Sequence, residues 1–406
     1  MSFKQSLSKQ LLFLCFLLSN VVFAQTEPTI ITVTPQAYTK TVVRIPNLEG
    51  DPKGEISSLI RNVLNLHLFC VALEEPPLPG FKSKEYYLKG KVERRDGKYS
   101  LTGELLDTLE NRALKKYKIE ATSAELLAYG IVDQIIRDIS PYQGVSATRI
   151  TFVKRDTAGD HLFIMDFSKK NLRKLRSSEL ILFPKFSPSS KKIAYIAFDG
   201  KDYYLEILTL STNEVKKFKI AGLSSAPIWL PNERELILTL GREGEIHIYL
   251  FNLEREELKA LTSGKGVHQA GSISADGKWI AFVGDRSGKP QIYLLHIETK
   301  RINRISFEGS YNTSPRFLPK GNLIYLSQRA GKNELILYNL QTGEKKRLSL
   351  PYSLNDPAPS PTGDYLIFAG KGQGSKGLYL LHLDSLIVHN YLPFGSVYFP
   401  DWGKIF

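Results

Sequence analysis

Cysteine is scarce in this chain, which has two cysteines, two methionines and three tryptophans in 406 residues. Cys15 lies in an apolar run near the N-terminus, so removal of that run would leave Cys70 alone. One cysteine can form neither an internal disulfide nor a multi-cysteine zinc site. Cys70 lies in the apolar run Leu66 to Ala72, which favours a buried thiol over a nucleophile.

Motifs of common enzymes are also missing. The sequence has no H-E-x-x-H and no G-x-S-x-G, and its seven histidines are scattered. Gly372-Gln-Gly-Ser-Lys-Gly377 matches G-x-G-x-x-G, but it leads into the apolar run Leu378 to Leu381 instead of a helix. His296 and His382 recur at one repeat position with other polar residues and are predicted to cap turns. We therefore expect no enzyme activity, no metal and no cofactor.

Long apolar runs are absent after the N-terminal leader. Lys4 and Lys9 precede the apolar stretch Leu11 to Phe23, and Val22-Phe-Ala24 precedes Gln25, which predicts a signal peptide cleaved after Ala24. The run is shorter than the about 20 residues that span a bilayer. We expect an exported, soluble product whose net charge falls from +13 to +11 with the two lysines. Its paired turn lysines predict a solvated surface, and no nucleic-acid partner is expected after export.

One stretch, Phe183-Pro-Lys-Phe-Ser-Pro-Ser-Ser-Lys-Lys-Ile-Ala-Tyr195, recurs along the second part of the chain. Its leading position falls at Pro184, Pro227, Gly271, Pro315 and Pro357, in steps of 43, 44, 44 and 42 residues. A period of about 40–45 residues is typical of a four-stranded propeller blade. Short apolar runs between turn residues predict strands within each repeat.

A second marker is the polar residue that ends the third strand of each repeat. It occurs at Asp166, Thr209, Asn252, His296, Asn339 and His382. Six third strands thus accompany only five complete first strands. Val397-Tyr-Phe-Pro-Asp-Trp402 places Pro400 43 residues after Pro357, so we predict that it supplies the missing strand beside Arg149 to Val153. A ring closed in this way leaves no open sheet edge.

Residues before the repeats mix helix and strand patterns. Thr122-Ser-Ala-Glu125 is a capping-box pattern at the start of a helix that runs to Ile139, and Glu55 to Leu66 has helical apolar spacing. Strands are predicted over 41–45, 69–73, 85–92, 99–106 and 113–119. The fold class is therefore mainly β, with a small α+β domain over 25–145 and a six-bladed β-propeller over 146–406.

This order of features resembles the TolB family. The junction Gln143-Gly-Val-Ser-Ala-Thr-Arg-Ile-Thr-Phe-Val153 is similar to the family's entry into blade one, and Gly395-Ser-Val-Tyr-Phe-Pro-Asp-Trp402 to its terminal strand. Pro184 to Tyr195 resembles the repeat pattern Pro-x-Phe/Trp-Ser-Pro-Asp-Gly followed by Ile-Ala-Tyr. The resemblance implies a periplasmic scaffold of the Tol–Pal envelope system that supports outer-membrane integrity and cell division. Its propeller mouth would bind the Pal lipoprotein, and its segment from Gln25 would bind the inner-membrane protein TolA.

The candidate partner site is the propeller mouth. Loops from each fourth strand to the next first strand gather around the central channel, and they carry mixed polar and aromatic side chains suited to protein recognition. The predicted partner-binding residues are His268, Gln269, Tyr311, Asn312 and Asn355. The α+β domain is expected to offer no comparable concave surface, and the protein is expected to be a monomer.

Two alternatives stay open at this point. One is an orphan propeller that binds another envelope ligand, such as a glycan or a different lipoprotein. The other is a propeller-fold lyase, which would need His, Asp or Glu residues converging from the inner strands. The predicted inner strands are mostly apolar or small.

Overall fold

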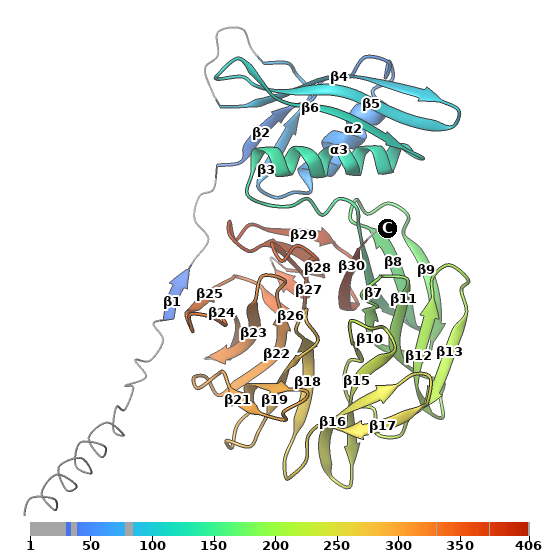
Figure 1. Cartoon of the computed structure of the whole chain (residues 1–406), viewed down its shortest axis with the longest axis vertical. Helices are drawn as coiled ribbons and strands as arrows, with labels where there is room; N and C mark the ends of the chain where they lie inside the picture. The colour runs from blue at the N-terminus through green and yellow to red at the C-terminus, as the bar shows by residue number, and fades with distance from the viewer. Residues whose placement is uncertain (1–29, 34–38, 78–83, 330, 373, 405–406) are drawn as a thin grey trace, which may run out of the picture.

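The computed structural model describes residues 30–33, 39–77, 84–329, 331–372 and 374–404 (Figure 1). The expected signal peptide and its cleavage site after Ala24 lie outside these residues. Neither of the two described helices is long and apolar enough to cross a membrane.

The N-terminal part is a five-stranded sheet with two helices, and α3 lies between this sheet and the propeller (Figure 1). The strand order is β3-β2-β4-β5-β6. The elements are β2 (Thr41–Arg44), α2 (Glu55–Asn65), β3 (Cys70–Leu73), β4 (Tyr86–Arg95), β5 (Lys98–Asp107), β6 (Arg112–Ala121) and α3 (Ala124–Ile139). Each predicted helix and strand of this part is present, with ends that differ by a few residues.

Both helices form because they carry a buried apolar stripe. Ile60, Val63 and Leu64 of α2 are buried, as are Leu127 and Ile131 of α3. The cap of α3 is Ser123, whose hydroxyl accepts a hydrogen bond from the Leu126 N–H at 3.2 Å. The capping-box prediction on Thr122 was therefore one residue too early, because Ser123 is the last residue with extended backbone.

The remaining described strands form six sheets, five of four strands and one of five, which confirms the predicted mainly-β, six-bladed propeller. Blade 1 is closed by the last strand, and its order is β30-β7-β8-β9. Its strands are β30 (Val397–Lys404), β7 (Thr148–Asp156), β8 (Gly159–Asp166) and β9 (Arg173–Ser178). Blade 2 comprises β10 (Leu180–Phe186), β11 (Lys192–Phe198), β12 (Tyr203–Thr209) and β13 (Val215–Lys219). Blade 3 comprises β14 (Ile228–Trp229), β15 (Glu235–Arg242), β16 (Glu245–Asn252) and β17 (Glu257–Ala260).

Blades 4 to 6 follow the same order from the channel outward. Blade 4 comprises β18 (His268–Ile273), β19 (Trp279–Gly284), β20 (Gln291–His296) and β21 (Ile302–Arg304). Blade 5 comprises β22 (Tyr311–Phe317), β23 (Asn322–Arg329), β24 (Lys332–Asn339) and β25 (Lys345–Leu348). Blade 6 comprises β26 (Ser353–Pro359), β27 (Tyr365–Gly372), β28 (Ser375–His382) and β29 (Val388–Leu392). One strand was not expected: β1 (Ile30–Val33) pairs in parallel with the outer edge of β25.

Ring closure rests on the pairing of β30 with β7. The proline spacing predicted this pairing, and the structure shows that the strands are antiparallel with Trp402 opposite Ile150. The Trp402 indole N–H also donates to the Thr148 hydroxyl at 2.8 Å. The first and last strands of the propeller therefore hold one blade together.

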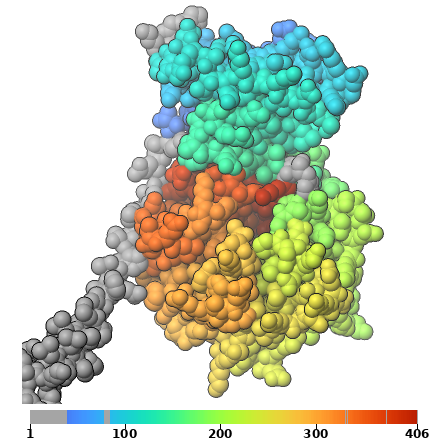
Figure 2. Space-filling model, in the orientation of Figure 1, coloured from blue at the N-terminus to red at the C-terminus, as the bar shows by residue number. Residues whose placement is uncertain are grey.

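The α+β domain rests on blades 6 and 1, where its last residues cover β27 to β30 (Figure 2). His67 is fully buried at this contact, with Nδ1 3.1 Å from the Tyr365 hydroxyl and Nε2 2.9 Å from the Ser146 hydroxyl. His382 holds its turn through Ser385 at 2.9 Å, as predicted, but its ring also lies 4.6 Å from the Tyr142 ring. The domain contact was not anticipated from the repeat position of His382.

Because these two histidines are buried, we expect the fold to lose stability in acid. Burial lowers the pKa of His67 from 6.5 to about 3 and that of His382 to about 4. The unfolded chain therefore takes up protons below pH 6.5 that the folded chain does not, and stability falls as the pH falls below 6.5. For each histidine the free energy of unfolding should be about 2 kcal/mol smaller at pH 5 than at pH 7.5.

Denaturant titrations at pH 7.5 and pH 5 test this expectation. The His67→Gln variant should lose less stability between the two pH values than the unmodified chain does. An equal loss in both proteins would show that His67 does not carry the effect.

Candidate functional site

The five predicted partner-binding residues lie on inner strands, not in the loops where they were expected. β18 begins at His268, β22 begins at Tyr311, and Asn355 is the third residue of β26. These polar residues were expected in loops, but the inner strands already begin at the rim, so the loops at the mouth are shorter than expected.

Two of the five residues share a cavity. Tyr311 and Asn355 line a hollow of about 350 Å³ between blades 5 and 6, together with Gln328, Asn333 and Asp356. The Tyr311 side chain is 47% exposed, and Asn355 is also exposed. Gln269 is exposed on blade 4 but does not line this cavity.

Asn312 and His268 are buried within the chain. The Asn312 amide donates to Gln291 Oε1 at 2.9 Å and to the Glu308 carbonyl at 2.7 Å, so it fixes the turn before β22. His268 has 1% of its surface exposed. Both residues therefore support the rim from inside.

The contacts of His268 determine where its proton lies. Arginine can only donate, so the bond from Arg286 Nη2 at 3.0 Å makes His268 Nε2 an acceptor. The neutral ring then carries its proton on Nδ1 and donates to His247 Nδ1 at 3.3 Å. His247 in turn donates from Nε2 to Glu245 at 3.0 Å. Burial, then Arg286 and His247, hold the pKa of His268 below its ordinary value.

The innermost strand of most blades contains a β-bulge. The pairing register shifts within the first strand of blades 1, 2, 4, 5 and 6. In four of these blades the residue just before the repeat proline has a positive φ, at Phe183, Ser314, Asp356 and Phe399. A bulge of this kind turns the local side chains away from the simple alternation of a strand.

Each blade contributes one residue to a ring around the channel, namely the residue that directly follows the repeat position held by proline in most blades. Its members are Lys185, Ile228, Ser272, Arg316, Ala358 and Asp401. Five of them line one cavity of about 440 Å³, and Ala358 is buried beside it. Gly271 lacks the proline of the other repeats because a Cβ there would lie 2.6 Å from the Pro315 ring.

The channel is charged, which corrects the expectation of apolar or small inner strands. Lys185 pairs with Asp401 at 2.6 Å, and Asp401 also accepts from the Phe186 N–H at 2.9 Å. Arg316 donates to the carbonyls of Gly271, Pro315 and Pro357. The sequence repeats could have revealed these charges, because the residue one position after each repeat proline belongs to this ring.

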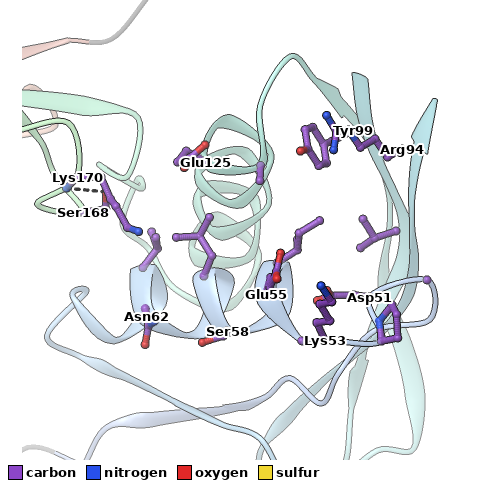
Figure 3. A pocket seen from close by; sticks show the side chains of 18 of the residues that line it. Asp51, Lys53, Glu55, Ser58, Asn62, Arg94, Tyr99, Glu125, Ser168 and Lys170 are labelled. Atoms are coloured by element: carbon purple, nitrogen blue, oxygen red, sulfur yellow. Dashed lines mark hydrogen bonds between the residues drawn. The ribbon is translucent and has the colours of Figure 1, made fainter. Parts of the chain in front are cut away.

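A further cavity is lined mostly by the α+β domain, contrary to the expected lack of a concave surface there. It has a volume of about 1030 Å³ and an apolar floor that includes Ile56, Leu59 and Val63 of α2. Figure 3 shows Glu55, Ser58 and Asn62 along α2, Arg94 and Tyr99 on the sheet, and Ser168 and Lys170 on a turn of blade 1. This hollow arises where two domains meet, which local sequence patterns do not report.

Other candidate sites have structural roles. Gly372 ends β27 and Ser375 begins β28, so the glycine motif joins two strands, as predicted.

Burial raises the pKa of the Cys70 thiol to about 12, which makes it a poor nucleophile. Within the described ranges, no group of three or more His, Cys, Asp or Glu side chains is placed to hold a metal ion.

The described elements define a six-bladed β-propeller that carries an α+β domain on one face. Residues 137–406 match the family model described as the TolB beta propeller domain. The chain therefore belongs to the TolB beta-propeller family.

Named relatives agree with this assignment. The Tol-Pal system proteins TolB of Bordetella pertussis and Bordetella parapertussis are each 30% identical over 225 residues, or 53% of this chain. The chain spans about half the length of these curated relatives, 51% in each case. The crystal structure of TolB from Acinetobacter baumannii has a similar fold, with a TM-score of 0.79 and 22% identity over 91% of this chain and 97% of that chain.

Proposed function

We propose that this chain is a periplasmic protein-binding scaffold of the Tol–Pal type without chemistry of its own. Its mouth would hold a Pal-like lipoprotein, in support of outer-membrane integrity and cell division. The observation that carries the proposal is the cavity between blades 5 and 6, where Tyr311 and Asn355 are both exposed. An exposed aromatic ring beside amide groups is the composition of a protein-binding hot spot.

The roles of the five mouth residues differ. We assign partner contact to Tyr311, Asn355 and Gln269, which are exposed. His268 and Asn312 hold the rim through their buried hydrogen bonds. A scaffold is favoured over a lyase because Lys185 and Asp401 already engage each other and Arg316 donates to backbone carbonyls.

A second partner, a TolA-like inner-membrane protein, is proposed for the segment from Gln25. This proposal is supported by the family and by the expected export signal. The part of the segment that the structure describes, β1, pairs with the edge of blade 5 over only four residues. Short edge pairing of this kind can be exchanged for pairing with another chain.

Replacing both exposed anchors should abolish most of the lipoprotein binding. The Tyr311→Ala/Asn355→Ala variant is expected to bind the purified periplasmic domain of the lipoprotein from the same organism at least ~30-fold more weakly, because truncated hot-spot side chains cost about 2 kcal/mol or more. Calorimetric titration of the full mature chain measures the affinity.

Tyr203→Ala is the matched control, because Tyr203 of blade 2 is 46% exposed, close to Tyr311. It should bind like the unmodified chain. Full-strength binding by the double variant would reject this site, and no binding by the unmodified chain would favour an orphan propeller with another envelope ligand.

A further inference from the structure

The lining of the mouth cavity contains an acidic side chain but no basic one. Among the residues that line it, Asp356 is the one ionisable acid, and none is a lysine or arginine. The whole chain has a net charge of +13, so most of its charged side chains are basic, whereas none of the residues that line this cavity is. Asn355, Gln328 and Asn333 add exposed amide groups to the lining, and Tyr311 adds an aromatic ring.

Asp356 lies near the cations of the channel but makes no close ion pair with them in the described ranges. Lys185 is paired with Asp401, and the Arg316 donors reach backbone carbonyls. No ion pair of 4 Å or shorter joins Asp356 to any residue in the described ranges. Burial raises the pKa of the Asp356 carboxyl group, while the nearby charges of Arg316 and Lys185 act in the opposite direction. The backbone N–H of Phe399 acts in the same direction as these cations, and a carboxylate has acceptor capacity for several further donors.

The backbone at Asp356 adopts an unfavourable conformation. Asp356 has a φ of 50°, in the left-handed region that side chains other than glycine rarely adopt. It lies in the bulge of β26, where the register shifts between Asn355 and Ala358. A bulge re-aims a side chain, and strained positions of this kind gather at functional sites.

We propose that this cavity receives an arginine side chain of the bound partner. The guanidinium would pair with Asp356 and lie against the Tyr311 ring, while the amide oxygens of Asn355 and Gln328 accept its remaining N–H groups. Guanidinium is planar, stacks on aromatic rings and offers five donors, whereas a lysine ammonium is a compact charge. The partner's identity rests on the proposed function, but the chemistry of the cavity does not.

A small probe tests the cavity without any partner. N-acetyl-arginine methylamide is titrated into the full mature chain and followed by NMR, with N-acetyl-citrulline methylamide as the neutral isostere. The arginine probe should bind at least about tenfold more tightly than the citrulline probe, since hydrogen bonds to charged groups are the stronger ones. Equal binding of both probes, or no binding of either, overturns the proposal.

Two variants locate the site. Asp356→Asn should lose the preference for arginine, and Tyr311→Leu should weaken the arginine probe while keeping the carboxylate. Asp384→Asn neutralises an exposed carboxylate on a turn of the same blade and should change nothing. If Asp356→Asn does not keep the melting temperature of the unmodified chain, Tyr311→Leu decides the outcome, because the Tyr311 ring is about half exposed. An undiminished arginine preference in a folded variant rejects the assignment.

The lipoprotein titration separates this inference from the proposed function. If the unmodified chain binds the lipoprotein and Asp356→Asn binds it equally well, the arginine pocket is wrong and the scaffold proposal stands. If the arginine probe binds at Asp356 but the lipoprotein does not bind, the pocket stands and the proposed partner is wrong.

Discussion

Deletion of residues 396–406 is expected to leave the protein insoluble or unfolded at temperatures where the full mature chain is folded. The deletion removes β30 and leaves β7 as an unpaired edge, which invites aggregation. It also removes the buried side chains of Val397 and Trp402, each worth about 1.5–3 kcal/mol. Tyr398 and Phe399 contribute less, because both are only half-buried.

The matched control is a deletion of residues 405 and 406 alone. It leaves every described pair of β30 with β7 in place, since β30 ends at Lys404. Thermal unfolding followed by circular dichroism compares the two truncated chains. An unchanged melting temperature in the longer deletion would contradict closure of the ring by β30.

Loss of the channel ion pair is expected to have the second largest effect. Asp401→Ala leaves the Lys185 ammonium largely buried without its partner and removes the acceptor of the Phe186 N–H. Breaking a buried pair from one side typically costs about 3–5 kcal/mol, so a loss of about 3 kcal/mol in the free energy of unfolding is expected.

The cost should depend on the uncompensated charge. Lys185→Met in the same chain as Asp401→Ala removes that charge, so the double variant should be more stable than Asp401→Ala by at least about 1 kcal/mol. Urea titrations of the single and double variants provide the comparison. Additive losses would show that packing, and not charge, explains the effect of Asp401→Ala.

Repetition explains why the propeller could be predicted. The repeat position held by proline in five blades and by Gly271 in the other recurs at nearly constant spacing, in or directly before an inner strand. The short apolar runs then predicted the strands of each blade. Six third strands were found with only five first strands, which predicted that Val397 to Trp402 closes the ring. These signals are local or periodic, so one sequence was enough to find them.

The site could be predicted only in part, because its geometry depends on the bulges. Tyr311 and Asn355 were placed at the mouth, and the structure brings them to one cavity. Asp356 and Arg316 were missed because a bulge sets two residues opposite one and breaks the alternation that assigns faces. The contact of His67 with Tyr365 joins residues 298 positions apart, and no repeat reports such a pair.

Protection of backbone amides from hydrogen exchange is the direct test of lipoprotein binding at the propeller mouth. The full mature chain is compared with and without the purified lipoprotein domain, and exchange is mapped by peptide. We expect slower exchange at the rim ends of β22 and β26 when the lipoprotein is bound, with little change along α2. Protection confined to the α+β domain, around the cavity lined by α2, would contradict binding at the propeller mouth.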